Sequence, residues 1–140
     1  MGPRDQILTM AADHFGTASD RLNPNDLFGK NKLEGDDASE FWEEFASTFG
    51  VDLTNLRTYL HYDANEPPGW RTVWGIGANG HRIPDIPIGL ADLQTAVETG
   101  KWQMTYPAHR LQERRVLTPS IASLLLVFAL IYLVWSTFLR

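Results

Sequence analysis

A long apolar run closes the chain and limits what it can fold into. Residues 121–139 contain no charged side chain. A helix of about 20 apolar residues is what crosses the hydrocarbon core of a bilayer. We therefore expect a transmembrane helix over residues 119–140, with residues 119–139 in contact with lipid. The alternative is a buried helix of a soluble core, but so small a domain could not cover a helix that is apolar all round.

The charges beside this run predict its orientation. Arg110, Arg114 and Arg115 precede the run, and only Arg140 follows it. Basic residues near the end of a membrane helix favour the cytoplasmic side. We expect a single-pass, tail-anchored protein of the inner (cytoplasmic) membrane, with its N-terminal domain in the cytoplasm. The lack of cysteine fits a reducing compartment.

Residues 36–51 are predicted to form one amphipathic helix, around which the soluble part is organised. Asp36 or Asp37 is the expected N-cap, and Gly50 is expected to end the helix in a left-handed conformation. Apolar side chains recur at three- and four-residue steps, which is the spacing of a core face. They are Ala38, Phe41, Trp42, Phe45 and Phe49.

The opposite face of this helix is predicted to be strongly negative. From Glu34 to Glu44 the sequence has six carboxylates and no Lys or Arg. Such a charge pattern attracts a basic protein surface from a distance. The alternative is a solvated face that only keeps the domain soluble. The candidate partner-binding residues on this face are Asp36, Asp37, Glu40, Glu43 and Glu44.

The other elements complete a predicted all-α domain over residues 1–102. Helices are expected over residues 3–15 and 89–100, with a short helical turn or two within 52–62. The loop before the acidic helix is expected to be anchored to the core by four apolar residues, Leu22, Leu27, Phe28 and Leu33. Residues 63–82 are an insertion, predicted to be a loop or short hairpin with a brief strand at 72–74. In it, Trp70 and Trp74 are candidate protein-contact residues, or alternatively a lid over the core. Residues 103–118 form a juxtamembrane connector.

Four short motifs follow one another along the chain: Gly35-Asp36-Asp37-Ala38, Phe49-Gly50-Val51-Asp52-Leu53, Ala91-Asp92-Leu93 and Gly100-Lys101-Trp102. In this order and spacing they resemble a family of small bacterial proteins of unknown function with an acyl-carrier-like fold. The resemblance covers roughly residues 3–102, apart from the insertion. It implies a small helical bundle of the acyl-carrier type.

The same resemblance implies where a phosphopantetheine arm would be attached. In a working carrier, a serine follows the Asp at the start of the acidic helix, and here that position is Ala38. Alanine has no oxygen to receive the arm. Ser39 is the alternative attachment site, although one residue along a helix turns the side chain by about 100°.

Other chemistry has little support in the sequence. The histidines lack the paired spacing of a helix-borne metal site, and His61 would meet Asp63 and His81 only if the insertion folded back. We expect no metal, no cofactor and no enzymatic activity. A formal net charge of −5 argues against nucleic-acid binding.

The sequence thus predicts a non-enzymatic, membrane-tethered, carrier-like adaptor or accessory subunit. Its acidic helix and tryptophan-bearing insertion would bind a protein partner, with membrane complexes among the candidates. One alternative is an acyl carrier protein modified at Ser39 that serves a membrane enzyme. Another is a small structural subunit of a membrane complex that binds through its transmembrane helix.

Overall fold

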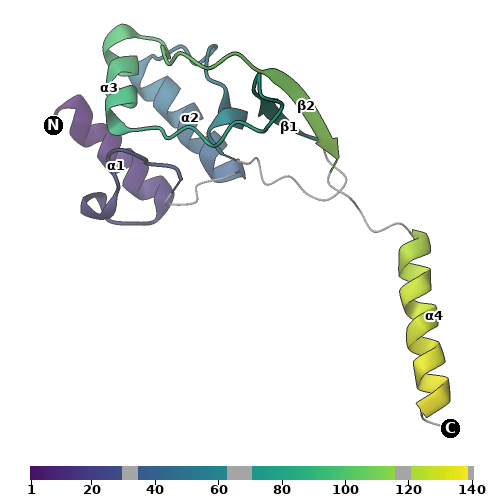
Figure 1. Ribbon diagram of the computed structural model, residues 1–140. Coiled ribbons are helices and arrows are strands. Elements are labelled where there is room, and N and C mark those ends of the chain that lie inside the picture. The colour runs from purple at the N-terminus through teal and green to yellow at the C-terminus, as the bar shows by residue number, and fades with distance from the viewer. Residues whose placement is uncertain (30–34, 63–70, 116–120, 139–140) are drawn as a thin grey trace.

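The computed structural model describes residues 1–29, 35–62, 71–115 and 121–138. Within these ranges the protein is mostly helical, with three helices in a globular part and a fourth standing apart (Figure 1). The helices are α1 (Pro3–Phe15), α2 (Gly35–Phe49), α3 (Leu90–Thr99) and α4 (Ile121–Phe138). The shorter elements are the 3-10 turns η1 (Ser19–Arg21) and η2 (Thr58–Leu60) and the strands β1 (Arg71–Ile76) and β2 (Arg110–Arg115). The helices predicted from the sequence are therefore confirmed.

Helix α2 buries the face that its spacing predicts. Ala38, Phe41 and Phe45 have no exposed surface, and Trp42 is 5% exposed. Gly50 ends the helix with φ at 66°, as expected for its left-handed stop. The predicted N-cap is wrong, because the helix already begins at Gly35. Both aspartates instead lie in the first turn, where their negative charge interacts favourably with the positive end of the helix dipole.

Aromatic rings hold the neighbouring segments on α2. Phe28, from the loop before the helix, stacks on Trp42 with 5.2 Å between ring centroids and on Tyr62 with 5.7 Å. Leu22 and Leu27 are buried beside it, so the predicted anchoring of this loop is confirmed. The fourth expected anchor, Leu33, lies outside the described residues. Each aromatic pair of this kind adds about 0.5–1.5 kcal/mol to the effect of burial alone.

The segments that follow α2 and α3 run side by side. The Asp52 amide donates to the Gly100 carbonyl at 2.9 Å, and the Trp102 amide donates to the Asp52 carbonyl at 2.8 Å. These bonds bring Trp102 into the core, where it is 1% exposed and meets Trp42 edge-on at 5.5 Å. The chain beyond α3 is thus tied to α2 before it turns toward the C-terminus.

A small sheet corrects the all-α prediction. β1 and β2 pair antiparallel over six positions, with Arg71 opposite Arg115 and Ile76 opposite Arg110. The strand expected at 72–74 is present, and its six-residue partner is part of the connector. The predicted short hairpin is present only as an antiparallel bridge between Ile76 and Arg82 across the local turn. Gly75 allows the sheet to pack on η2, because a Cβ atom there would lie 2.5 Å from Cδ2 of Leu60.

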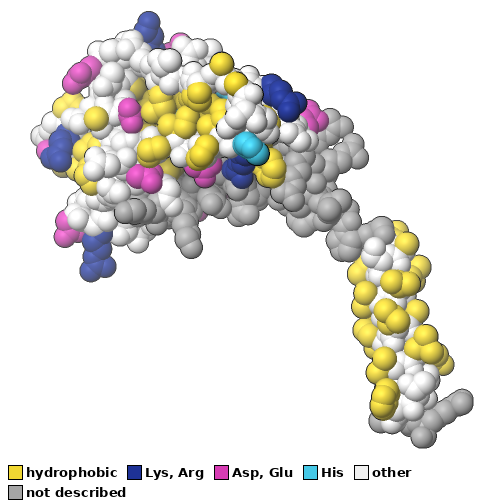
Figure 2. All heavy atoms as spheres, viewed as in Figure 1, with side chains coloured by type: hydrophobic (Ala, Val, Ile, Leu, Met, Phe, Trp, Pro, Cys, Tyr) yellow, Lys and Arg dark blue, Asp and Glu magenta, His cyan; other side chains and the backbone are white. Residues whose placement is uncertain are grey.

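Helix α4 is long and apolar enough to cross a membrane. None of its 18 residues is buried against the rest of the protein. Figure 2 shows hydrophobic side chains along its length, whereas the visible face of the globular part mixes apolar and charged side chains. At 1.5 Å per residue it is about 27 Å long, close to the ~30 Å thickness of a hydrocarbon core.

Removing the Phe28 ring should unfold the globular part more easily. We expect Phe28→Ala to lower the free energy of unfolding by about 3–5 kcal/mol, because it leaves a cavity beside the two rings on which Phe28 stacks. Urea denaturation of the full chain in non-ionic detergent, followed by tryptophan fluorescence, measures this. Leu111→Ala, at a side chain that is 59% exposed, is the control and should change stability by no more than about 0.5 kcal/mol. Equal effects would contradict this role of Phe28.

Candidate functional site

The predicted acidic residues form one exposed strip on α2. Asp36, Asp37, Glu40, Glu43 and Glu44 are all exposed, and helical spacing puts them opposite the buried aromatic face. In the described part of the chain, the first four make no ion pair with a Lys or Arg side chain. Their negative charge is therefore presented to solvent, and Asp36 and Asp37 lie in the first turn, where the helix dipole is positive.

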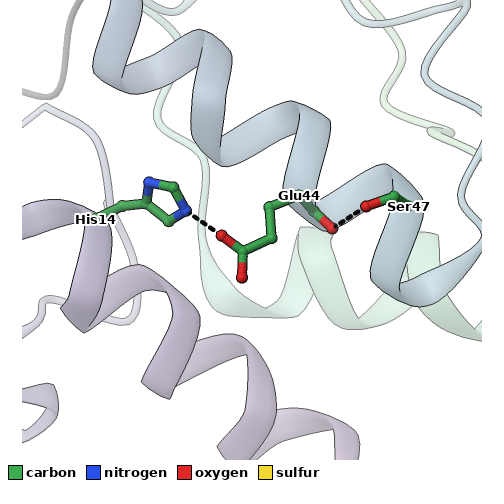
Figure 3. A network of polar contacts seen from close by, with 3 residues as sticks. All are labelled: His14, Glu44 and Ser47. Carbon is green, nitrogen blue, oxygen red and sulfur yellow. Dashed lines mark hydrogen bonds and ion pairs between the residues drawn. The ribbon is translucent and has the colours of Figure 1, made fainter.

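Glu44 differs from the other four because it holds α1 and α2 together (Figure 3). Its Oε2 atom lies 2.6 Å from Nε2 of His14 on α1. The His14 side chain is only 16% exposed, and its ring packs edge-on against Phe41 at 5.7 Å. Sequence analysis missed this pair because the two residues are 30 positions apart and neither carries a local signal for the other.

The predicted tryptophan contacts belong to a different element. Trp74 is partly buried in β1, and the guanidinium carbon of Arg82 lies 4.8 Å from the centroid of its ring. Arg82 also forms an ion pair with Asp85 at 3.3 Å. Trp70 lies outside the described residues. The acidic strip on α2 and Trp74 on β1 are therefore two separate candidate surfaces.

The residues considered for a phosphopantetheine arm face in different directions. Ala38 has no exposed surface, so a serine at that position would place its hydroxyl in the core. Ser39 is exposed, one residue further along α2. The position that the resemblance assigns to the arm-bearing serine is thus a core position in this structure.

The sequence did not reveal a buried polar network around the hydroxyl of Tyr106. The indole N–H of Trp102 donates to this oxygen at 2.8 Å, and the backbone N–H of Arg57 donates to it at 3.3 Å. His61 contacts the same hydroxyl through Nε2 at 2.8 Å and the Ile86 carbonyl through Nδ1 at 2.7 Å. A carbonyl only accepts, so Nδ1 carries the proton and Nε2 accepts the Tyr106 hydrogen.

This network keeps the His61 imidazole neutral. Its side chain is 3% exposed, and burial lowers the pKa of His61 below its ordinary value of 6.5. A second proton, on Nε2, would face a hydroxyl that already accepts from Trp102 and Arg57. Burial also raises the pKa of Tyr106, so the phenol keeps its proton.

The structure does not support His61 and His81 as ligands of one metal ion. Both ring nitrogens of His61 are bonded within the protein, and His81 is exposed in the turn after β1. Asp63 lies outside the described residues. Across the described ranges, no three His, Asp or Glu side chains gather as metal ligands would.

A shallow hollow of about 180 Å³ lies beside α3, lined by Asp92, Thr95, Trp102, Gln103 and Met104. Its one carboxylate is already used, because Oδ2 of Asp92 accepts the Gly89 amide at 2.8 Å and caps the helix. The single carboxylate that lines the hollow is therefore already hydrogen-bonded to the backbone.

Tyr106→Phe should destabilise the fold although it removes a single oxygen. The change leaves the Trp102 N–H and the His61 Nε2 atom buried without their partner, which costs about 1–3 kcal/mol. Urea titration at pH 7.5 in detergent is the measurement. Tyr132→Phe, on the exposed surface of α4, is the matched control and should leave the midpoint unchanged. Indistinguishable midpoints would show that the network contributes no stability.

Stability should fall as the pH drops below about 6.5, the ordinary pKa of an imidazole. The folded-state pKa of His61 is lowered, so below this pH the unfolded chain binds a proton that the folded chain excludes. Above it both states are neutral and the effect vanishes. His61→Phe removes this contribution, so its free energy of unfolding should decrease less between pH 7.5 and pH 5 than that of the unchanged chain. His81→Gln serves as control and should keep the original slope. A parallel slope in His61→Phe would contradict the assignment.

In comparisons with protein-family models, curated proteins and solved structures, nothing matches the chain. The geometry of its own residues must therefore carry any functional argument. That geometry consists of an exposed acidic strip on α2, a separate surface around Trp74, and an apolar helix long enough to cross a membrane.

Proposed function

We propose that this protein is a non-enzymatic, membrane-tethered adaptor or accessory subunit whose carrier-like helical domain binds a basic protein partner. The observation that carries the proposal is the strip of Asp36, Asp37, Glu40 and Glu43 on α2. These carboxylates are exposed together, and in the described residues no Lys or Arg neutralises them through an ion pair.

The strip is suited to recognition at a distance. Clustered charge of one sign raises association rates with an oppositely charged surface by about 10- to 1000-fold, and the effect is screened by salt over a Debye length of about 8 Å at physiological ionic strength. Because α2 is fixed by its buried rings, the strip is presented in one orientation. Trp74 supplies a second, less polar contact on β1.

The proposed setting is the inner membrane, with α4 as the anchor and the globular part in the cytoplasm. The apolar surface of α4 supports the anchor, since none of it is buried by the protein. Arg110, Arg114 and Arg115 before this helix, against a single Arg140 after it, support the orientation. A partner within the same membrane would meet the domain at high effective concentration.

Reversing the charge of the strip should release the partner without unfolding the domain. The variant is Asp37→Lys with Glu40→Lys and Glu43→Lys, and Glu44 is left intact because it pairs with His14. Tagged full-length protein is purified from its own host in mild detergent, and stoichiometric co-purifying proteins are identified by mass spectrometry. We expect one basic partner to be lost, while helical content by circular dichroism stays the same.

A matched control separates local recognition from net charge. Asp13→Lys, Asp20→Lys and Glu98→Lys change the total charge equally at exposed sites outside α2, and this triple variant should keep the partner. Retention by both variants would refute the acidic strip as the binding surface. If α4 fused to an unrelated soluble domain then recovered the same partner, the transmembrane helix would be the binding element.

The exposure of Ser39 supports a second candidate, a true acyl carrier for a membrane enzyme. Its hydroxyl lies near the start of α2, where a phosphopantetheinyl transferase would approach. Co-expression with such a transferase, followed by intact mass measurement, tests this function. A mass increase that Ser39→Ala abolishes would establish the carrier, and an unchanged mass would exclude modification by that enzyme.

A further inference from the structure

The two strands are rich in positive charge, and β2 is the last element of the globular part before α4 (Figure 1). We name β1 and β2 together the arginine ribbon. Its two six-residue strands contain four arginines and one glutamate, in a chain whose formal net charge is −5. These residues are Arg71, Arg110, Arg114, Arg115 and Glu113.

The register gathers three of these arginines at one end of the ribbon. Arg71 is directly opposite Arg115, and Thr72 is opposite Arg114. An anion complements positive charge gathered in this way, and phosphate suits arginine because guanidinium groups bind phosphate through paired N–H bonds.

Covalent geometry keeps this end close to the bilayer. β2 ends at Arg115 and α4 begins at Ile121, so the intervening chain spans at most about 20 Å even if fully extended. The 18 residues of α4 nearly match the hydrocarbon thickness, which places Ile121 at its edge once the helix is inserted. Arg115 is therefore always within reach of the lipid headgroups.

The remaining composition of the ribbon also suits a membrane interface. Leu111 in β2 is 59% exposed, and Trp74 in β1 is partly exposed opposite Gln112. Tryptophan is enriched at the level of the headgroups, where an apolar ring and a polar edge are both accommodated. Leu111 pairs with Gly75 and Trp74 with Gln112, so each face of the ribbon has one of these two apolar side chains.

We propose that the arginine ribbon binds the anionic phospholipid headgroups of the bilayer that α4 spans, and so docks the domain on the membrane surface. The occupant is lipid because an anionic surface lies within the reach of the ribbon and has the opposite charge. This inference rests on the membrane insertion of α4 in the proposed function. It adds a second attachment, which determines how the domain is oriented on the membrane.

A single label on the ribbon tests this contact in the full chain. The sequence has no cysteine, so Gln112→Cys, at an exposed position, accepts one fluorophore. The protein is reconstituted in vesicles of phosphatidylcholine alone or of equal parts phosphatidylcholine and phosphatidylglycerol, each with a trace of lipid that carries a headgroup quencher. We expect stronger quenching with phosphatidylglycerol, and loss of the difference near 1 M salt, where the Debye length is about 3 Å.

Paired variants identify the arginines as the cause. Arg114→Gln with Arg115→Gln should lower the ratio of docked to undocked domain by roughly 30-fold on the anionic vesicles. Arg4→Gln with Arg21→Gln removes the same charge from exposed sites near α1 and should leave quenching unchanged. Circular dichroism verifies that each variant keeps its helices.

A separate measurement distinguishes the anchor from the ribbon. Vesicles are washed with alkaline carbonate and floated, which retains only inserted protein. Protein that stays inserted but is quenched equally in both lipids, or equally in both double variants, would overturn the ribbon contact and leave the anchor intact. Protein removed by carbonate would overturn the anchor and the ribbon contact together.

Discussion

Burial of one face of α2 is the interaction on which the rest of the structure depends. Each segment around this helix is held by a ring against it: Phe28 stacks on Trp42, Trp102 meets Trp42 edge-on, and His14 meets Phe41. Because the aromatic face of α2 is buried against these segments, the opposite face of the helix is the one exposed to solvent. The exposure of the acidic strip therefore follows from how the core is built.

Hydrophobic spacing and glycine stops made the helices predictable, whereas the sheet depended on tertiary structure. Gly16, Gly50 and Gly100 each take a positive φ where a helix ends, and the apolar stripe of α2 repeats with the helical period. In contrast, β2 has the sequence RLQERR, with one apolar residue and no alternation. It forms a strand because the chain beyond Trp102 is already tied to the core and passes beside β1.

Some features of the candidate site were likewise predictable from the sequence, and others required the tertiary structure. The exposure of Glu40 and Glu43 follows from the buried face opposite them, so sequence was sufficient for it. The pairing of Glu44 with His14 and the bond between His61 and Tyr106 required the packing of distant segments. The resemblance to acyl carriers was predicted from the order of short motifs, and it stays a prediction because no family model, curated protein or solved structure matches the chain.

The close approach of Gly75 to Leu60 also couples the two strands to η2. Near the C-terminal end of β1, the backbone of Gly75 lies against Leu60. β2 begins after His109, whose Nε2 atom lies 2.9 Å from the Tyr59 hydroxyl. Both strands thus contact the same turn, η2, at this end of the ribbon. A substitution that moves η2 would therefore displace β1 and β2 together rather than one strand alone.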